Sequence, residues 1–157
     1  MKTIAAGAIL FLSLLGSGCD QSGRGLVLNL HRAAGYLSTA TTILERQTST
    51  GAISRETGAK IAGDLLTLNK VNADLVVAIK PFLSPDGQRL ELTGDGRAKV
   101  LSILGAARGV IFSRLSDPEF LLLSPAQRQE ITAIYQALDG LILVSVEIVS
   151  TAKEAKK

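Results

Sequence analysis

The sequence predicts an all-α protein, an up-down antiparallel four-helix bundle that follows an N-terminal signal peptide. Three observations favour this fold. Apolar residues recur at alternating spacings of three and four along four long segments, which is the period of one helix face. Helix-capping residues and turns that contain proline or glycine separate these segments. The connections between them are short, which favours antiparallel neighbours.

The first 18 residues have the organisation of a secretory signal. Lys2 supplies a positive charge, and the segment from Ile4 to Leu15 is apolar and uncharged. This segment is shorter than the roughly 20 residues of a transmembrane helix, so we expect a cleaved signal peptide over residues 1–18. Residues 19–25 are polar and glycine-rich, and we expect them to form a flexible tether ahead of a helical domain at residues 26–157.

The first two helices of this domain are expected over residues 26–48 and 54–81. Ser54 is placed to cap the second helix, and Pro81 marks its end or a kink because proline has no backbone N–H. Their apolar stripes are Leu26, Leu30, Ala33, Leu37, Ala40 and Leu44 in the first helix, and Ile61, Leu65, Leu68, Asn72, Leu75 and Ile79 in the second.

Turn residues separate the second helix from the third. Residues 84–87 read Ser-Pro-Asp-Gly, a strong turn signature, and residues 89–93 alternate polar and apolar, which indicates a short extended piece. A third helix is expected over residues 97–115. A fourth begins after Ser124, where Ser-Pro-Ala-Gln is typical of a capping box, and continues to about Ala152. Its inward stripe is expected to consist of Ile131, Ile134, Leu138, Leu141, Ser145, Ile148 and Ala152. The expected core includes Leu65, Leu104 and Leu138.

Cys19 is the only cysteine, and a lone cysteine in an exported protein needs an explanation. Leu15-Gly16-Ser17-Gly18-Cys19 resembles the lipobox of bacterial lipoprotein precursors, although the family usually has leucine where this chain has Gly16. The resemblance covers residues 1–20. It implies a diacylglyceryl thioether on Cys19 and cleavage just before that residue. Asp20 then resembles the signal that keeps enterobacterial lipoproteins in the inner membrane, or it is a solvated residue of the tether.

Two other fates of the N-terminus stay open. Gly16 and Gly18 also satisfy the small-x-small rule of ordinary signal peptidase at the same bond, which would release a soluble product. An uncleaved anchor is the third. The lipobox implies a protein of the cell envelope, anchored by lipid on the outer side of the cytoplasmic membrane. In a Gram-negative cell this is the periplasmic face of the inner membrane, with the outer membrane left open.

Composition argues against several classes of function. The chain has 17 Lys and Arg against 14 Asp and Glu, interleaved along its length, and it has no Trp. Nucleic-acid binding needs a basic face and often stacking rings, so we expect none. His31 is the only histidine and Cys19 is expected to carry lipid, so we expect neither a metal site nor a cofactor. No serine lies in a nucleophile-elbow sequence, and we expect no enzyme activity.

Three polar residues fall within the apolar stripes of the predicted helices. Asn69 and Asn72 belong to the second helix, and Arg108 belongs to the third. Buried asparagines can fix the register of packed helices. Alternatively, the three residues could converge on a polar or anionic ligand, and Arg108 could also extend its charged group to the surface.

The predicted topology brings the two ends of the domain together. The first helix starts where the fourth helix ends, so Arg24 should lie near the C-terminal Lys153, Lys156 and Lys157. These basic residues are expected either to contact anionic headgroups or only to complement the dipole of the last helix.

The sequence therefore favours a membrane-anchored envelope lipoprotein with a non-enzymatic helical domain. Its role would be scaffolding or docking to an envelope protein that the sequence does not identify. The alternative is a carrier of a small ligand, with a polar-lined pocket between helices.

Overall fold

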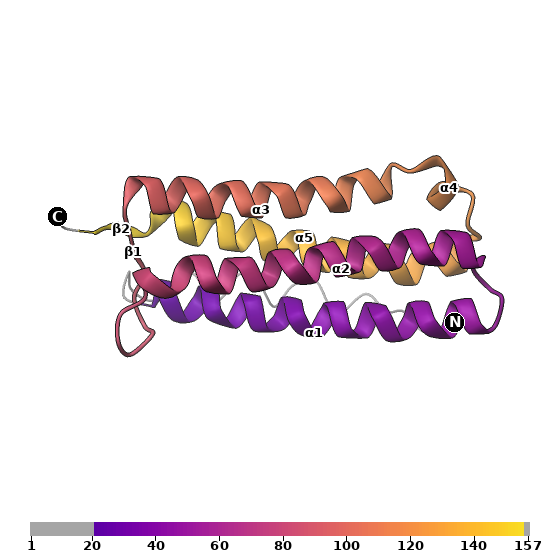
Figure 1. The fold of residues 1–157 in the computed structure, drawn as a ribbon, viewed down its shortest axis with the longest axis horizontal. Coiled ribbons are helices and arrows are strands. Elements are labelled where there is room, and N and C mark those ends of the chain that lie inside the picture. The colour runs from indigo at the N-terminus through magenta and orange to yellow at the C-terminus, as the bar shows by residue number, and fades with distance from the viewer. Residues whose placement is uncertain (1–20, 156–157) are drawn as a thin grey trace, which may run out of the picture.

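The computed structural model describes residues 21–155 and confirms the all-α four-helix bundle (Figure 1). Contacts join α1 to α2, α2 to α3, α3 to α5 and α5 to α1, so the long helices form a closed ring of antiparallel neighbours. These helices are α1 (Ser22–Ser49), α2 (Arg55–Ile79), α3 (Gly94–Leu115) and α5 (Pro125–Thr151).

Short elements lie at the two ends of the bundle. At the end where α1 begins, here called the proximal end, are the 3-10 helix η2 (Lys80–Phe82) and the strands β1 (Glu91–Leu92) and β2 (Lys153–Glu154). The short helix α4 (Pro118–Leu121) lies at the opposite, distal end.

The capping signals in the sequence account for most helix starts. The hydroxyl of Ser54 accepts a hydrogen bond from the backbone N–H of Thr57 at 3.1 Å, as expected for the start of α2. Ser124 and Gln127 form the capping box expected at the start of α5. The third helix begins at Gly94, three residues earlier than expected, because Thr93 caps it.

The core consists of two apolar clusters stacked along the bundle axis. Leu65, Leu104 and Leu138 are all buried, which confirms the predicted inward faces of three helices. Among the described helices, α5 alone is long and apolar enough to cross a membrane by length and composition. One third of its most apolar stretch, 33%, is buried inside the bundle, and its inward face supplies residues to both clusters.

The expected tether over residues 19–25 is wrong for its last four positions, because α1 begins at Ser22. Contacts with the loop before β1 stabilise this early start. The backbone N–H of Gly23 donates to the carbonyl of Gln88 at 2.9 Å, and the hydroxyl of Ser22 accepts from the N–H of Leu90 at 3.1 Å. A Cβ at Gly23 would lie 2.8 Å from the backbone carbonyls of Gly87 and Arg89. The loop and the helix therefore fit together only because residue 23 has no side chain.

The extended piece expected at residues 89–93 is present as β1, and its partner is the end of the chain. β1 pairs in parallel with β2, and the N–H of Ala155 donates to the carbonyl of Leu92 at 3.1 Å. A guanidinium nitrogen of Arg97 also donates to the carbonyl of Ala152 at 2.7 Å. The C-terminal segment is thus fixed beside the start of α1, at the end that the predicted topology assigns to it.

We predict that Gly23→Ala lowers the stability of the domain. The added methyl group would overlap the backbone of the loop, and such overpacking costs about 1–3 kcal/mol. Gly35 of the same helix is the matched control, because a Cβ there meets no atom within 4 Å. Gly35→Ala should instead stabilise the helix by up to about 1 kcal/mol. Urea unfolding followed by circular dichroism measures both changes, and equal effects would contradict the close contact at Gly23.

Candidate functional site

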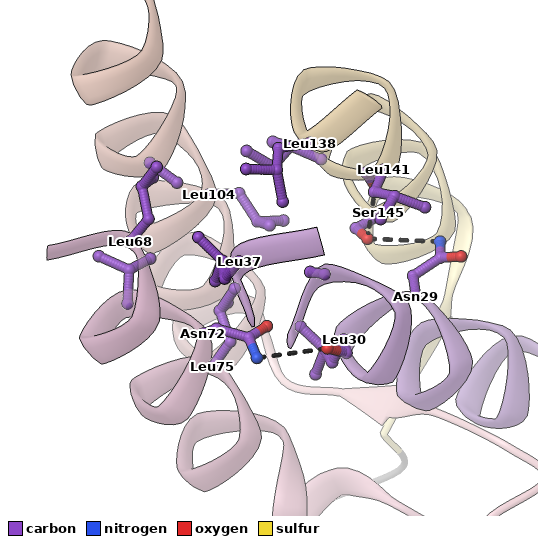
Figure 2. A pocket seen from close by; sticks show the side chains of 14 residues that line it. Asn29, Leu30, Leu37, Leu68, Asn72, Leu75, Leu104, Leu138, Leu141 and Ser145 are labelled. Atoms are coloured by element: carbon purple, nitrogen blue, oxygen red, sulfur yellow. Dashed lines mark hydrogen bonds between the residues drawn. The ribbon is translucent and has the colours of Figure 1, made fainter. Parts of the chain in front are cut away.

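A small cavity lies in the middle of the bundle, between all four long helices (Figure 2). Its volume is about 40 Å³, and nearly all of its wall is aliphatic. Asn29, Asn72 and Ser145 are the polar residues that line it. Ligand pockets for organic molecules measure roughly 300–1,000 Å³. This cavity is therefore large enough only for a few water-sized molecules.

The polar side chains of the cavity bind one another or the backbone of a neighbouring helix. The amide nitrogen of Asn29 donates to the hydroxyl of Ser145 at 3.5 Å, which is a long hydrogen bond, and this hydroxyl donates to the carbonyl of Leu141 at 2.8 Å. The amide nitrogen of Asn72 donates to the carbonyl of Leu30 at 3.2 Å. The bond of Asn29 joins α1 to α5, and the bond of Asn72 joins α2 to α1. A shift of either helix pair by one residue along the axis would break the bond between them.

The predicted convergence of Asn69, Asn72 and Arg108 is wrong. Asn69 is exposed on the outside of α2, one position past the buried Leu68. Arg108 does not line the cavity either. Its guanidinium binds the carboxylate of Asp139 on α5 at 2.7 Å and lies 5.1 Å from the ring centre of Phe112. Only Asn72 reaches the cavity, where it has the register-fixing role that buried asparagines can perform.

Sequence reasoning missed Asn29 as a member of this cavity. It lies three residues after Leu26 and next to Leu30, both of which were assigned to the core. A polar residue at that spacing is itself a signal for a buried polar group, because residues three and four apart share a helix face. Ser145 occupies a predicted stripe position of the last helix and is buried there as expected.

A second polar cluster lies towards the distal end and is electrostatic. Arg114 of α3 is buried, and its guanidinium binds Asp64 of α2 and Asp117 at the start of α4. Burial disfavours the charged guanidinium, but the hydrogen bond and charge of Asp64 and the charge of Asp117 outweigh it and raise the pKa of Arg114. The cluster therefore ties three elements together through one cation.

Tyr135 lies near this cluster with its hydroxyl buried. The hydroxyl has no hydrogen-bond partner among the described residues. Burial, followed by the negative charge of Asp64, raises the pKa of Tyr135 above its ordinary value of 10.0. The phenol is thus held neutral, and its ring packs in the distal apolar cluster.

The proximal end holds the described members of the predicted membrane-facing set. Arg24 is exposed on the first turns of α1, and Lys153 is exposed in β2. His31 is exposed on α1. Within residues 21–155, no group of three or more His, Cys, Asp or Glu residues could hold a metal ion. The predicted lipidation site Cys19, the sorting residue Asp20, and the tail residues Lys156 and Lys157 lie outside the described residues.

Comparison of the chain with protein-family models, with curated proteins and with solved structures finds no match.

We predict that Arg114→Met destabilises the domain by about 3 kcal/mol, because two carboxylates would lose the cation between them. Arg46→Met is the matched control. The side chain of Arg46 is 61% exposed and binds only the exposed Glu130, so its loss should cost at most about 1 kcal/mol. Urea unfolding at neutral pH measures both variants. Equally small losses would mean that the buried cluster contributes no more than a surface ion pair.

We also predict that Tyr135→Phe leaves the domain at least as stable at neutral pH, because it removes a buried hydroxyl that lacks a partner. The pKa of Tyr135 is raised in the folded state, so folding favours the protonated phenol over the ionised one. The free energy of unfolding that depends on this preference is fully present below the unfolded pKa of 10.0 and is lost as pH rises beyond it. The parent should therefore lose more stability than the variant between neutral and strongly alkaline pH. Urea unfolding at several pH values measures this difference. If the free energies of unfolding of the two proteins fall equally with rising pH, the prediction is wrong.

Proposed function

We propose that this protein is an envelope lipoprotein, anchored by lipid on Cys19, whose helical domain is a non-enzymatic scaffold or docking module. The observation that carries the proposal is the lipobox-like sequence at residues 15–19, which contains the only cysteine of the chain. The proposed place is the outer side of the cytoplasmic membrane.

The position of the folded domain supports this reading. Only Asp20 and Gln21 separate Cys19 from the first residue of α1. Three residues of extended chain span at most about 11 Å. A lipid on Cys19 would therefore hold the proximal end of the bundle directly against the bilayer.

The polar interior gives more support to scaffolding or docking than to catalysis or transport. Arg108, Arg114 and Asn72 all bind groups on neighbouring helices, which is a structural use of these side chains. The central cavity is too small for a typical organic ligand, so the geometry lends the alternative, a small-ligand carrier, less support.

The distal end carries apolar side chains that no described element covers. Leu122, which follows α4, is 85% exposed, and Leu121 is 50% exposed. Large apolar side chains that project together from a surface are typical of protein docking sites. In the proposed orientation these leucines would lie furthest from the membrane, where a partner protein of the envelope could reach them.

We predict that full-length protein isolated from bacterial membranes carries a diacylglyceryl thioether on Cys19. Intact-mass and peptide mass spectrometry would show the added lipid and the cut between Gly18 and Cys19. Cys19→Ser should abolish the modification and leave an uncleaved precursor, because the thioether needs the thiol. A mature N-terminus with a free cysteine thiol would contradict the proposal and favour ordinary secretion.

A further inference from the structure

Four apolar side chains project from α1 and α2 close to the proximal end. The exposed fraction is 44% for Val27, 43% for Leu28, 48% for Val76 and 72% for Val77. The hydrogen bond from Asn72 to the carbonyl of Leu30 fixes the pairing of the two antiparallel helices. Three residues further towards the proximal end, this pairing places residue 27 opposite residue 75, next to Val76. The four side chains therefore form one surface, here called the proximal patch.

Basic residues surround the proximal patch. Arg24 and Lys80 lie on its proximal side and Lys70 on its distal side, and all three are exposed. Acidic residues are scarce on these two helices. α1 has none between Ser22 and Leu44, and Asp74 is the one acidic residue of α2 between Leu66 and Ile79. The helix surface around the patch is thus complementary in charge to anionic headgroups, while the exposed acids Asp86, Glu91 and Glu154 of this end lie on the adjoining loop and strands.

The chain that precedes α1 determines what this surface can contact. Val27 and Leu28 lie five and six residues after the first residue of α1, a rise of about 8–9 Å. Val77 lies only two residues before the end of α2. A lipid on Cys19, three residues before Ser22, would bring a bilayer to this same end. A partner protein on the proximal patch would have to share that space with the headgroups.

We propose that the proximal patch rests on the bilayer, so that the α1–α2 side of the bundle leans towards the membrane. This inference rests on the proposed lipid anchor. Valine and leucine side chains beneath a basic rim match the composition of surfaces that insert about 5–10 Å into the boundary between headgroups and acyl chains. The patch is small, but the anchor holds it at high effective concentration, so a weak contact suffices.

The test places a polarity-sensitive fluorophore on the patch of the lipidated full-length protein. With the Cys19 thiol lipidated as proposed, an introduced cysteine would supply the free thiol for labelling, since Cys19 is the only native cysteine. Val77→Cys is the reporter. Leu66→Cys is its matched control, because Leu66 is also 72% exposed on α2. It lies eleven residues further from the proximal end, about 16 Å along the helix. In vesicles with anionic lipid, we expect a blue-shifted emission and quenching by lipid-bound quenchers at position 77 but not at position 66.

A second pair of labels guards against a local effect of one substitution. Leu28→Cys and Thr39→Cys lie on exposed positions of α1, near to and far from the proximal end. The Leu28 label should behave like the Val77 label. Replacing Arg24 and Lys80 with glutamine should reduce lipid quenching at both patch positions, and neutral vesicles should have the same effect. Circular dichroism of each labelled protein confirms that the bundle is intact.

The outcomes separate this inference from the proposed anchor. Mass spectrometry of the same preparations first establishes the lipid on Cys19, and an unmodified Cys19 overturns the proposed function. If Cys19 is lipidated but both patch labels stay accessible to aqueous iodide, the anchor stands and the inference is wrong. If the labels are shielded from iodide without lipid quenching, a protein covers the patch, and the inference is again wrong.

Discussion

The contact between the first turn of α1 and the loop before β1 determines the geometry of the proximal end. It depends on the bare backbone of Gly23, which approaches the carbonyls of the loop more closely than any side chain would permit. Because this contact starts the helix at Ser22, only two residues lie between Cys19 and the first residue of α1, and the longer tether expected from the sequence is absent. This close approach therefore sets the distance between Cys19 and the proximal end of the bundle.

Two sets of polar contacts inside the bundle have different effects. The bonds of Asn29, Asn72 and Ser145 are between neutral groups and specify which residues of neighbouring helices lie opposite one another. The cluster around Arg114 is charged and joins α3 to α2 and to the turn that leads into α4. The neutral hydrogen bonds fix the helices along the bundle axis, and the charged cluster around Arg114 holds the distal end together. The two apolar clusters supply the driving force for packing.

The sequence predicts those parts of this fold that local chemistry determines. Ser54 and Ser124 start their helices where their capping signals lie, because a cap and its partner are three residues apart. The start of α1 escapes such reasoning, since its partners lie more than 60 residues further along the chain. Asn69 was misplaced for another reason. Successive helix positions differ by about 100°, so a neighbour of a core residue can still face solvent. Of the three polar residues that line the cavity, the sequence placed Asn72 in the proposed pocket and Ser145 on an inward stripe, and it missed Asn29.

The pairing of β1 with β2 joins residue 91 to residue 153, so residues that follow α5 complete the proximal end of the bundle. In the order of the sequence, α1, α2 and α3 all precede the strand β2 that completes this pairing. Until Ala155 arrives to bond with Leu92, the apolar residues of the proximal cluster lack their final cover. A truncation before Lys153 would therefore remove the strand that pairs with β1 and the bond to Leu92, and it would leave the proximal cluster open on that side.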